Sequence, residues 1–227
     1  PMLATMGAHI PSDPEHWAFE YKWDGIRAIA FHEPRSWRID SRNRLDATHR
    51  YPDLQALHQS LGRRRAILDG EIVALDDAGH PSFKLLQRRM HVNGHAEINR
   101  LVDAVPILFV IFDLLYLDGK LLVDEPYEVR REKLQSLALI GPSWRITPSQ
   151  VGRGQSMLHA ARENLLEGVI AKRLRSVYMI GRRSSDWLKL KIVHSQEFVI
   201  GGWTMESTGL RIRIGTMLLG YHDAAGK

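Results

Sequence analysis

A lysine near the start of the chain stands between two runs of strand-forming residues, in the segment Lys22–Arg27 (KWDGIR). Aromatic residues alternate with other types from Trp17 to Tyr21, so we expect Lys22 at the end of a half-buried strand, before a turn at Asp24-Gly25. Burial and nearby positive charge lower the pKa of an amine from about 10.4, and the neutral amine is the nucleophilic form. The segment predicts a nucleophilic lysine; the alternative is an exposed lysine beside an ordinary hairpin turn.

Two further lysines, Lys189 and Lys191, lie two residues apart in a predicted strand, so their side chains point the same way. Lysines on one side of a strand repel each other unless an anion lies between them. This arrangement indicates a phosphate site. The alternative is a solvent-facing edge strand that lysines protect from further pairing.

Asp69 and Glu71 interrupt an apolar strand predicted over 66–75, again on one side of it. Either one of them holds a ligand hydroxyl or a metal-bound water, or this is an edge strand with a wet face. Phe112 lies near the end of the most apolar segment, a central strand predicted over 107–117. It is either core or the wall of a pocket for a flat ring.

The composition describes a globular chain: 227 residues, of which 44% are hydrophobic and 25% charged. The absence of cysteine excludes disulfides and thiolate-bound metals. The longest apolar run falls short of the ~20 residues that span a bilayer. We therefore expect a soluble intracellular protein without membrane contact.

A net charge of +5 points to a polyanionic partner, most often nucleic acid. Much of the excess comes in short arginine groups: Arg63-Arg64-Arg65, Arg88-Arg89, Arg130-Arg131 and Arg182-Arg183. The alternative for such groups is a solvated helix face or salt-bridge partners.

The remaining pattern predicts an irregular arm over 1–16, two or three strands over 17–39, and a helix that Asp53 caps. The histidines of the segment 91–95 are interpreted as surface residues that end a helix over 83–90. The other predicted elements are helices over 126–139 and 155–165, and strands over 167–172, 186–191, 197–203 and 214–221.

Together these segments resemble the ATP-dependent DNA ligases of the covalent nucleotidyltransferase superfamily. Lys22–Arg27 resembles the K-x-D-G-x-R motif of that family, and residues 41–48 resemble S-R-x-G-x-D-x-T, with Arg44 where glycine is usual. The other matching segments follow in the family's order: 69–71, 111–115, 167–172 and 187–191. The pattern of Tyr178, Gly181, Arg183, Ser184 and Trp187 is similar to bacterial ligases of the end-joining type.

The resemblance implies an α+β fold. Residues 1–193 would form an ATP-grasp-like adenylation (nucleotidyltransferase) domain of antiparallel sheets flanked by helices, and residues 194–227 the first strands of a truncated OB-fold barrel. The family's last motif, late in the OB domain, and an N-terminal helical DNA-binding domain are both missing from this sequence. We expect a minimal ligase, or the ligase module of a larger polypeptide, with a weakened first step.

The resemblance also implies the role of each site residue. Lys22 takes AMP from ATP, Lys189 and Lys191 face the α-phosphate, Arg42 lies near the phosphate, and Glu167 with Glu71 holds Mg²⁺ or Mn²⁺. Phe112 stacks on adenine, while Glu71 and Arg27 bind the ribose hydroxyls. The main chain at Glu20 and Tyr21 reads the adenine edge, and Lys172 takes the other face or edge.

The expected substrate is nicked duplex DNA, bound by a monomer in the bacterial cytoplasm, at the nucleoid, for repair, recombination or replication. End-bridging repair proteins are further candidate partners. The alternatives are a relative in the superfamily, such as an RNA ligase or a capping guanylyltransferase, or a catalytically silent module that binds nicks or ends.

Overall fold

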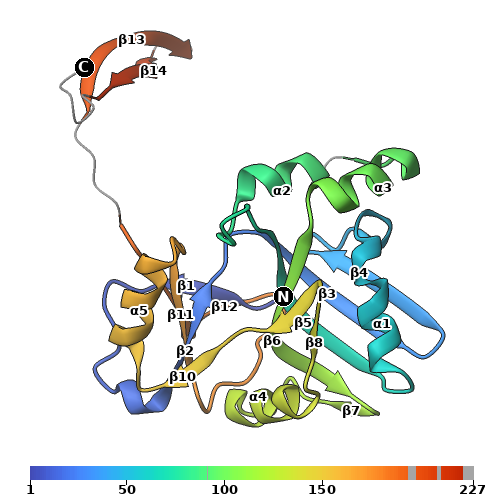
Figure 1. The fold of residues 1–227 in the computed structure, drawn as a ribbon. Coiled ribbons are helices and arrows are strands. Elements are labelled where there is room, and N and C mark those ends of the chain that lie inside the picture. The colour runs from blue at the N-terminus through green and yellow to red at the C-terminus, as the bar shows by residue number, and fades with distance from the viewer. Residues whose placement is uncertain (91, 194–197, 209–210, 222–227) are drawn as a thin grey trace. The chain divides into compact units, whose positions relative to one another are not determined.

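The computed structural model describes residues 1–90, 92–193, 198–208 and 211–221. It divides into two compact units, Pro1–Ile192 and Val193–Lys227, each of which is described by itself. The first unit contains two β-sheets with their helices, and the second contains a hairpin (Figure 1).

The first sheet of unit 1 has the strand order β1-β12-β11-β2-β10. Its strands are β1 (Leu3–Met6), β2 (Trp17–Lys22), β10 (Ser149–Val151), β11 (Gly168–Arg173) and β12 (Arg183–Lys191). All neighbours are antiparallel except β1 and β12, which are parallel. Helix α5 (Gly154–Glu163) covers one face, where Met157 packs with Phe19 and Val169 in a buried cluster.

The second sheet has the order β4-β3-β5-β6-β9-β8, with β7 also paired to β6. Its strands are β3 (Ile26–Glu33), β4 (Ser36–Ser41), β5 (Ala66–Ala74), β6 (Ile107–Leu117), β7 (Lys120–Leu121), β8 (Ile140–Gly141) and β9 (Trp144–Ile146). The helices are α1 (Gln55–Leu61), α2 (Phe83–Met90), α3 (His95–Ala104) and α4 (Tyr127–Ser136), with 3-10 turns η1 (Pro14–His16), η2 (Thr48–Arg50) and η3 (Pro52–Leu54). The largest buried cluster lies here, and β6 is central because it is apolar along nearly its whole length.

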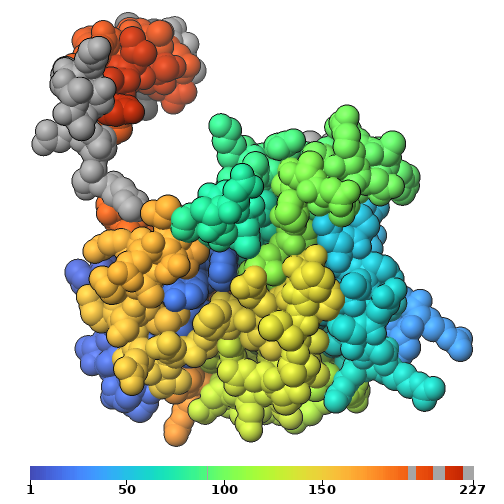
Figure 2. Space-filling model, viewed as in Figure 1, coloured from blue at the N-terminus to red at the C-terminus, as the bar shows by residue number. Residues whose placement is uncertain are grey.

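Within the described residues of unit 1 the chain passes between the two sheets twice. Residues 23–25 connect β2 to β3, and residues 147–148 connect β9 to β10. Gly25 approaches β5 so closely that a Cβ atom there would lie 2.2 Å from the carbonyl oxygen of Ile72, so only glycine fits. Figure 1 shows the yellow β9–β10 stretch running from one sheet to the other, and Figure 2 shows it between orange and green atoms.

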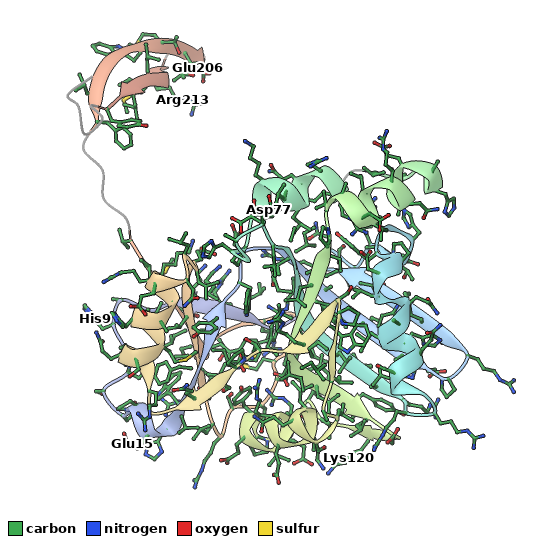
Figure 3. The ribbon with its side chains drawn as sticks, viewed as in Figure 1. His9, Glu15, Asp77, Lys120, Glu206 and Arg213 are labelled. Carbon is green, nitrogen blue, oxygen red and sulfur yellow. The ribbon has the colours of Figure 1, made fainter. Side chains whose placement is uncertain are left out.

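Unit 2 is described as an antiparallel hairpin of β13 (Val199–Thr208) and β14 (Arg211–Gly220). Glu206 pairs in register with Arg213 (Figure 3). Large apolar side chains such as Trp203 and Leu218 are exposed on it. A two-stranded hairpin is at best marginally stable alone. The start of the strand predicted over 197–203 and the boundary at residue 194 lie outside the described residues, and the OB-fold assignment stays a prediction.

Several local predictions need correction. The arm contains β1, which forms by pairing with β12 far along the chain and so has little local signal. Asp53 does not cap α1, because its carboxylate binds Arg89 and α1 begins without a side-chain cap. After α2 the chain forms a further helix, α3, which the sequence interpretation missed. His91 lies outside the described residues. Asp24-Gly25 connects two sheets and is not a hairpin turn.

Candidate active site

A cleft of about 180 Å³ opens where β2 ends and β3 begins. Nine of the predicted nucleotide-binding residues line it: Glu20, Tyr21, Lys22, Arg27, Arg42, Glu71, Phe112, Lys172 and Lys189. Six lining residues were not predicted as site residues: Leu3, Ala4, Trp23, Ile170, Arg183 and Trp187. Both sheets contribute to the cleft, which explains why its residues are spread through the sequence.

At one end of the cleft a single carboxylate holds two lysines. Glu167 forms ion pairs with Lys22 and, at 2.5 Å, with Lys191. Burial would raise the pKa of Glu167, but the hydrogen bonds from the two lysines outweigh it and lower that pKa. Lys22 is one-fifth exposed, which excludes the interpretation of a fully exposed lysine beside a hairpin. We call Lys22, Glu167, Lys189 and Lys191 the phosphate end, Lys189 being the neighbour that lines the cleft from β12.

One wall of the cleft is built from neighbouring strands β3 and β5. Arg27 binds both carboxylate oxygens of Asp69, at 2.5 and 2.7 Å, and Tyr178 donates to the same carboxylate at 2.6 Å. Asp69 is fully buried on an inner strand, so the interpretation of β5 as a wet edge strand is wrong. Asp69 outweighs the effect of burial and raises the pKa of Arg27. Burial raises the pKa of Glu71 to about 7, against the lowering effect of Arg27.

Phe112 forms an aromatic surface in the cleft and is 9% exposed. The guanidinium of Arg27 lies 4.4 Å from the centroid of its ring, and the ammonium of Lys172 lies 4.6 Å from it. Ile170 also lines the cleft, from β11. The cleft thus offers a flat apolar surface with cations next to it, which suits a planar ring bound to an anion.

A group of buried polar side chains, here called the floor, consists of Glu20 and Lys172, which line the cleft, and Tyr127 and Arg131, which do not. Lys172 pairs with Glu20 at 2.8 Å, and Tyr127 donates to the same carboxylate. Burial lowers the pKa of Lys172 despite the attraction of Glu20. The floor anchors the main chain just before Lys22.

The neighbouring Arg130 is also fully buried, and it binds both carboxylate oxygens of Asp113 at 2.8 and 2.9 Å. Arg89 is buried too, against Asp53. The interpretation of arginine groups as a surface for polyanions is therefore wrong for Arg89, Arg130 and Arg131. The burial of these arginines could not be predicted from the sequence, because an exposed arginine and a buried arginine in an ion pair have the same sequence pattern.

The geometry of the cleft agrees with the known proteins that this chain resembles. The profile of the ATP dependent DNA ligase domain matches residues 1–191. The chain belongs to the ATP-dependent DNA ligase family. This confirms the resemblance found in the sequence motifs and favours it over the RNA ligase and capping alternatives. None of the helices in the described part of the chain is long and apolar enough to cross a membrane.

The similar proteins include multifunctional end-joining ligases. The multifunctional non-homologous end joining protein LigD of Mycolicibacterium smegmatis is 40% identical over 227 residues, covering 100% of this chain and 28% of that protein. LigD of Pseudomonas aeruginosa is 40% identical over 226 residues, covering 98% of this chain and 25% of that protein. The chain thus spans about a quarter of the length of these relatives.

A solved structure described as mycobacterial DNA ligase D complexed with ATP and MES aligns with a TM-score of 0.74 at 37% identity, covering 97% of this chain and 67% of that one. The predicted nucleotidyltransferase fold of mixed α and β structure is therefore confirmed. Its sheets are mostly antiparallel, with two parallel pairs, β1–β12 and β6–β9.

Proposed function

We propose that this chain is the nucleotidyltransferase module of an ATP-dependent DNA ligase and that Lys22 carries AMP during the reaction. The observation that supports this best is the arrangement at the phosphate end. Lys22 lies where one sheet passes to the other, at the edge of a cleft with an aromatic surface, and shares Glu167 with Lys191. Glu167 is shared by two lysines and Lys189 lines the same cleft, so the positive charge exceeds the negative charge and a phosphate chain can neutralise it.

In the first step, Lys22 leaves its ion pair with Glu167, loses a proton to solvent and attacks the α-phosphorus of ATP. A P–N bond to Nζ forms, and the bond from that phosphorus to the bridging oxygen breaks, so that pyrophosphate departs with the electron pair. The nitrogen then releases a second proton to solvent, which leaves a neutral phosphoramidate nitrogen. Glu167 is a weak base for this step because its pKa is lowered. Lys189 and Lys191 face the phosphate oxygens and stabilise the charge that develops on them.

Glu167 and Glu71 are the carboxylates that would hold Mg²⁺ or Mn²⁺. The described residues contain no group of three or more His, Cys, Asp or Glu side chains suited to a metal. One or two carboxylates together with substrate phosphates fit the way Mg²⁺ is usually bound at phosphoryl-transfer sites. A bound Mg²⁺ would supply charge stabilisation on the phosphates.

The rest of the cleft binds the nucleoside in this proposal. Adenine stacks on Phe112, Glu71 and Arg27 bind the ribose hydroxyls, Arg42 lies near the phosphate, and the main chain at Glu20 and Tyr21 reads the base. Lys172 is buried and is held by Glu20 at 2.8 Å, so we assign it to the base edge rather than to an open face. Ile170, which the sequence interpretation missed, is a further candidate for contact with adenine.

The later steps act on DNA. AMP passes to the 5′-phosphate at a nick, and the adjacent 3′-hydroxyl displaces AMP and seals the strand. Exposed arginines such as Arg63 and Arg182 bind the duplex backbone, so affinity falls steeply as salt rises. The relatives named for non-homologous end joining support double-strand-break repair as the biological task. Our proposal places this task in the cytoplasm, with end-bridging proteins as partners. Residues 1–193 form the adenylation domain and residues 194–227 begin an OB fold.

The deciding experiment is the intact mass of the protein before and after incubation with ATP and Mg²⁺, compared with Lys22→Ala. A gain of one AMP, reversed by pyrophosphate and missing from the variant, is the expected result. Labelling by GTP instead would favour the capping enzyme. No labelling of either protein, together with equal binding of nicked DNA by both, would favour the silent module.

A further inference from the structure

Two buried residues far from Lys22 in sequence complete a ring of hydrogen bonds around it. The indole Nε1 of Trp23 donates to Oγ1 of Thr147 at 3.0 Å. Nη2 of Arg131 donates to the carbonyl oxygen of Thr147 at 2.5 Å, and Nη1 of the same guanidinium donates to Oε1 of Glu20 at 3.3 Å. The chain from Glu20 to Trp23, which includes Lys22, closes the ring.

The ring joins the two places where the chain passes between the sheets. Trp23 begins the crossing from β2 to β3, and Thr147 begins the crossing from β9 to β10. Thr147 is 1% exposed, and its amide donates to the carbonyl oxygen of Ile111 at 2.8 Å, which fixes it to central strand β6. A hydrogen bond from Trp23 to this residue therefore ties the lysine segment to the most buried part of the second sheet.

A side-chain ring of this kind restrains main-chain direction. Lys22 is partly exposed and its side chain has several rotatable bonds, so the backbone at Glu20 and Trp23 must be fixed for its amine to return to one place. Arg131 donates to both Glu20 and Thr147 from one planar guanidinium group, which a lysine at that position would not do. Neither Arg131 nor Thr147 lines the cleft.

We propose that Thr147 and Arg131 are positioning residues for the nucleophile Lys22, acting through Trp23 and Glu20. The inference rests on the proposed function, because it concerns the attack of Lys22 on ATP. Its distinctive consequence is that breaking the ring slows AMP transfer to the protein without weakening ATP binding. A residue needed only for folding would lower the folded fraction and leave the kinetics of the folded molecules unchanged.

The test compares Thr147→Val, which removes the acceptor and keeps the shape, with Thr147→Ser, which keeps the hydroxyl. Single-turnover AMP transfer is measured over a range of ATP concentrations, and thermal unfolding is measured in parallel. For Thr147→Val we expect the plateau rate to fall about tenfold, with the half-saturating ATP concentration within about twofold of the parent. Thr147→Ser should behave like the parent.

Trp23→Phe removes the donor of the same hydrogen bond and gives a second test if Thr147→Val does not fold. It should reproduce the fall in plateau rate. Where both single variants fold, the double variant should lose no more than the larger single loss, because both changes remove one interaction.

The outcomes separate the inference from the proposed function. A parent protein that takes up no AMP would contradict the function itself. If the parent is labelled, either of two results overturns the positioning role of the ring: a normal plateau rate in Thr147→Val, whatever its half-saturating ATP concentration, or an equal loss of rate in Thr147→Ser.

Discussion

The phosphate end and the floor hold their lysines in opposite ways. At the phosphate end, Lys22 and Lys191 share Glu167, and all three side chains keep contact with solvent. In the floor, Lys172 is buried against Glu20 and lies 4.3 Å from the centroid of the Trp187 ring. The first arrangement exchanges partners easily, and the second does not.

The physical difference is the cost of breaking each ion pair. A partly exposed pair contributes about 0–1 kcal/mol, because solvent replaces the lost partner. Breaking a buried pair costs about 3–5 kcal/mol, because a charge is left without water. We therefore expect substitutions at the phosphate end to affect reaction rate, and substitutions in the floor to affect folding first.

The largest expected effect is on rate, from Glu167→Gln. Without the carboxylate, Lys22 and Lys191 repel each other and lose their common orientation, so AMP transfer to the protein should fall about 100-fold. The free energy of unfolding should change by less than about 1 kcal/mol. Single-turnover labelling and urea denaturation measure the two quantities. Glu163→Gln, at an exposed pair with His159, is the matched control. A large loss of stability in Glu167→Gln would contradict the proposed difference between the phosphate end and the floor.

In the floor, Lys172→Met should lower the free energy of unfolding by about 3 kcal/mol, because Glu20 loses its closest cation while remaining buried. Urea denaturation measures this change. Lys84→Met, at an exposed position of α2, should have little effect. Equal stability of the two variants would show that Arg131 and Tyr127 are sufficient to stabilise the buried Glu20 carboxylate without Lys172.

Glu71 lines the cleft and gives the stability of the protein a dependence on pH. Its pKa is raised from 4.5 to about 7. As the pH rises from about 4.5 to 7, the unfolded chain releases this proton while the folded chain retains it, so the contribution of Glu71 to stability is lost over this range. Relative to Glu71→Gln, the parent should lose about 1–3 kcal/mol of unfolding free energy across the window. Parallel pH profiles of the two proteins would contradict the burial of this carboxyl.

The smallest effect is expected for Phe112→Leu, which replaces a ring by an aliphatic side chain at the base site. The loss of stacking should weaken ATP binding about threefold to tenfold, with a modest loss of stability. Equilibrium titration with ATP measures the affinity. Unchanged binding would assign Phe112 to the core of the second sheet.

Much of the site was predictable because its residues come in short segments with chemical meaning. The K-x-D-G-x-R segment located Lys22 and Arg27, and strand alternation placed Asp69 and Glu71 on one side of β5. The resemblance then supplied the fold, since the order of several segments is far more specific than any one of them.

The parts that were missed depend on contacts distant in sequence. Strand β1 exists because it pairs with β12, and the buried Arg131 on α4 donates hydrogen bonds to both Glu20 and Thr147. Local composition also misled the interpretation at Asp53, where a carboxylate suited to a helix cap binds Arg89 instead. In each case the partner is not visible within a short window.

The passage from β2 to β3 has a mechanical consequence. Only residues 23–25 separate the end of one sheet from the beginning of the other, and a chain of three residues reaches about 10–11 Å at most. This tether limits how far the lysine can move from the wall formed by β3 and β5, whatever opening the two sheets undergo. The short connection thus limits how far apart the two sheets can be at the site where the nucleotide binds.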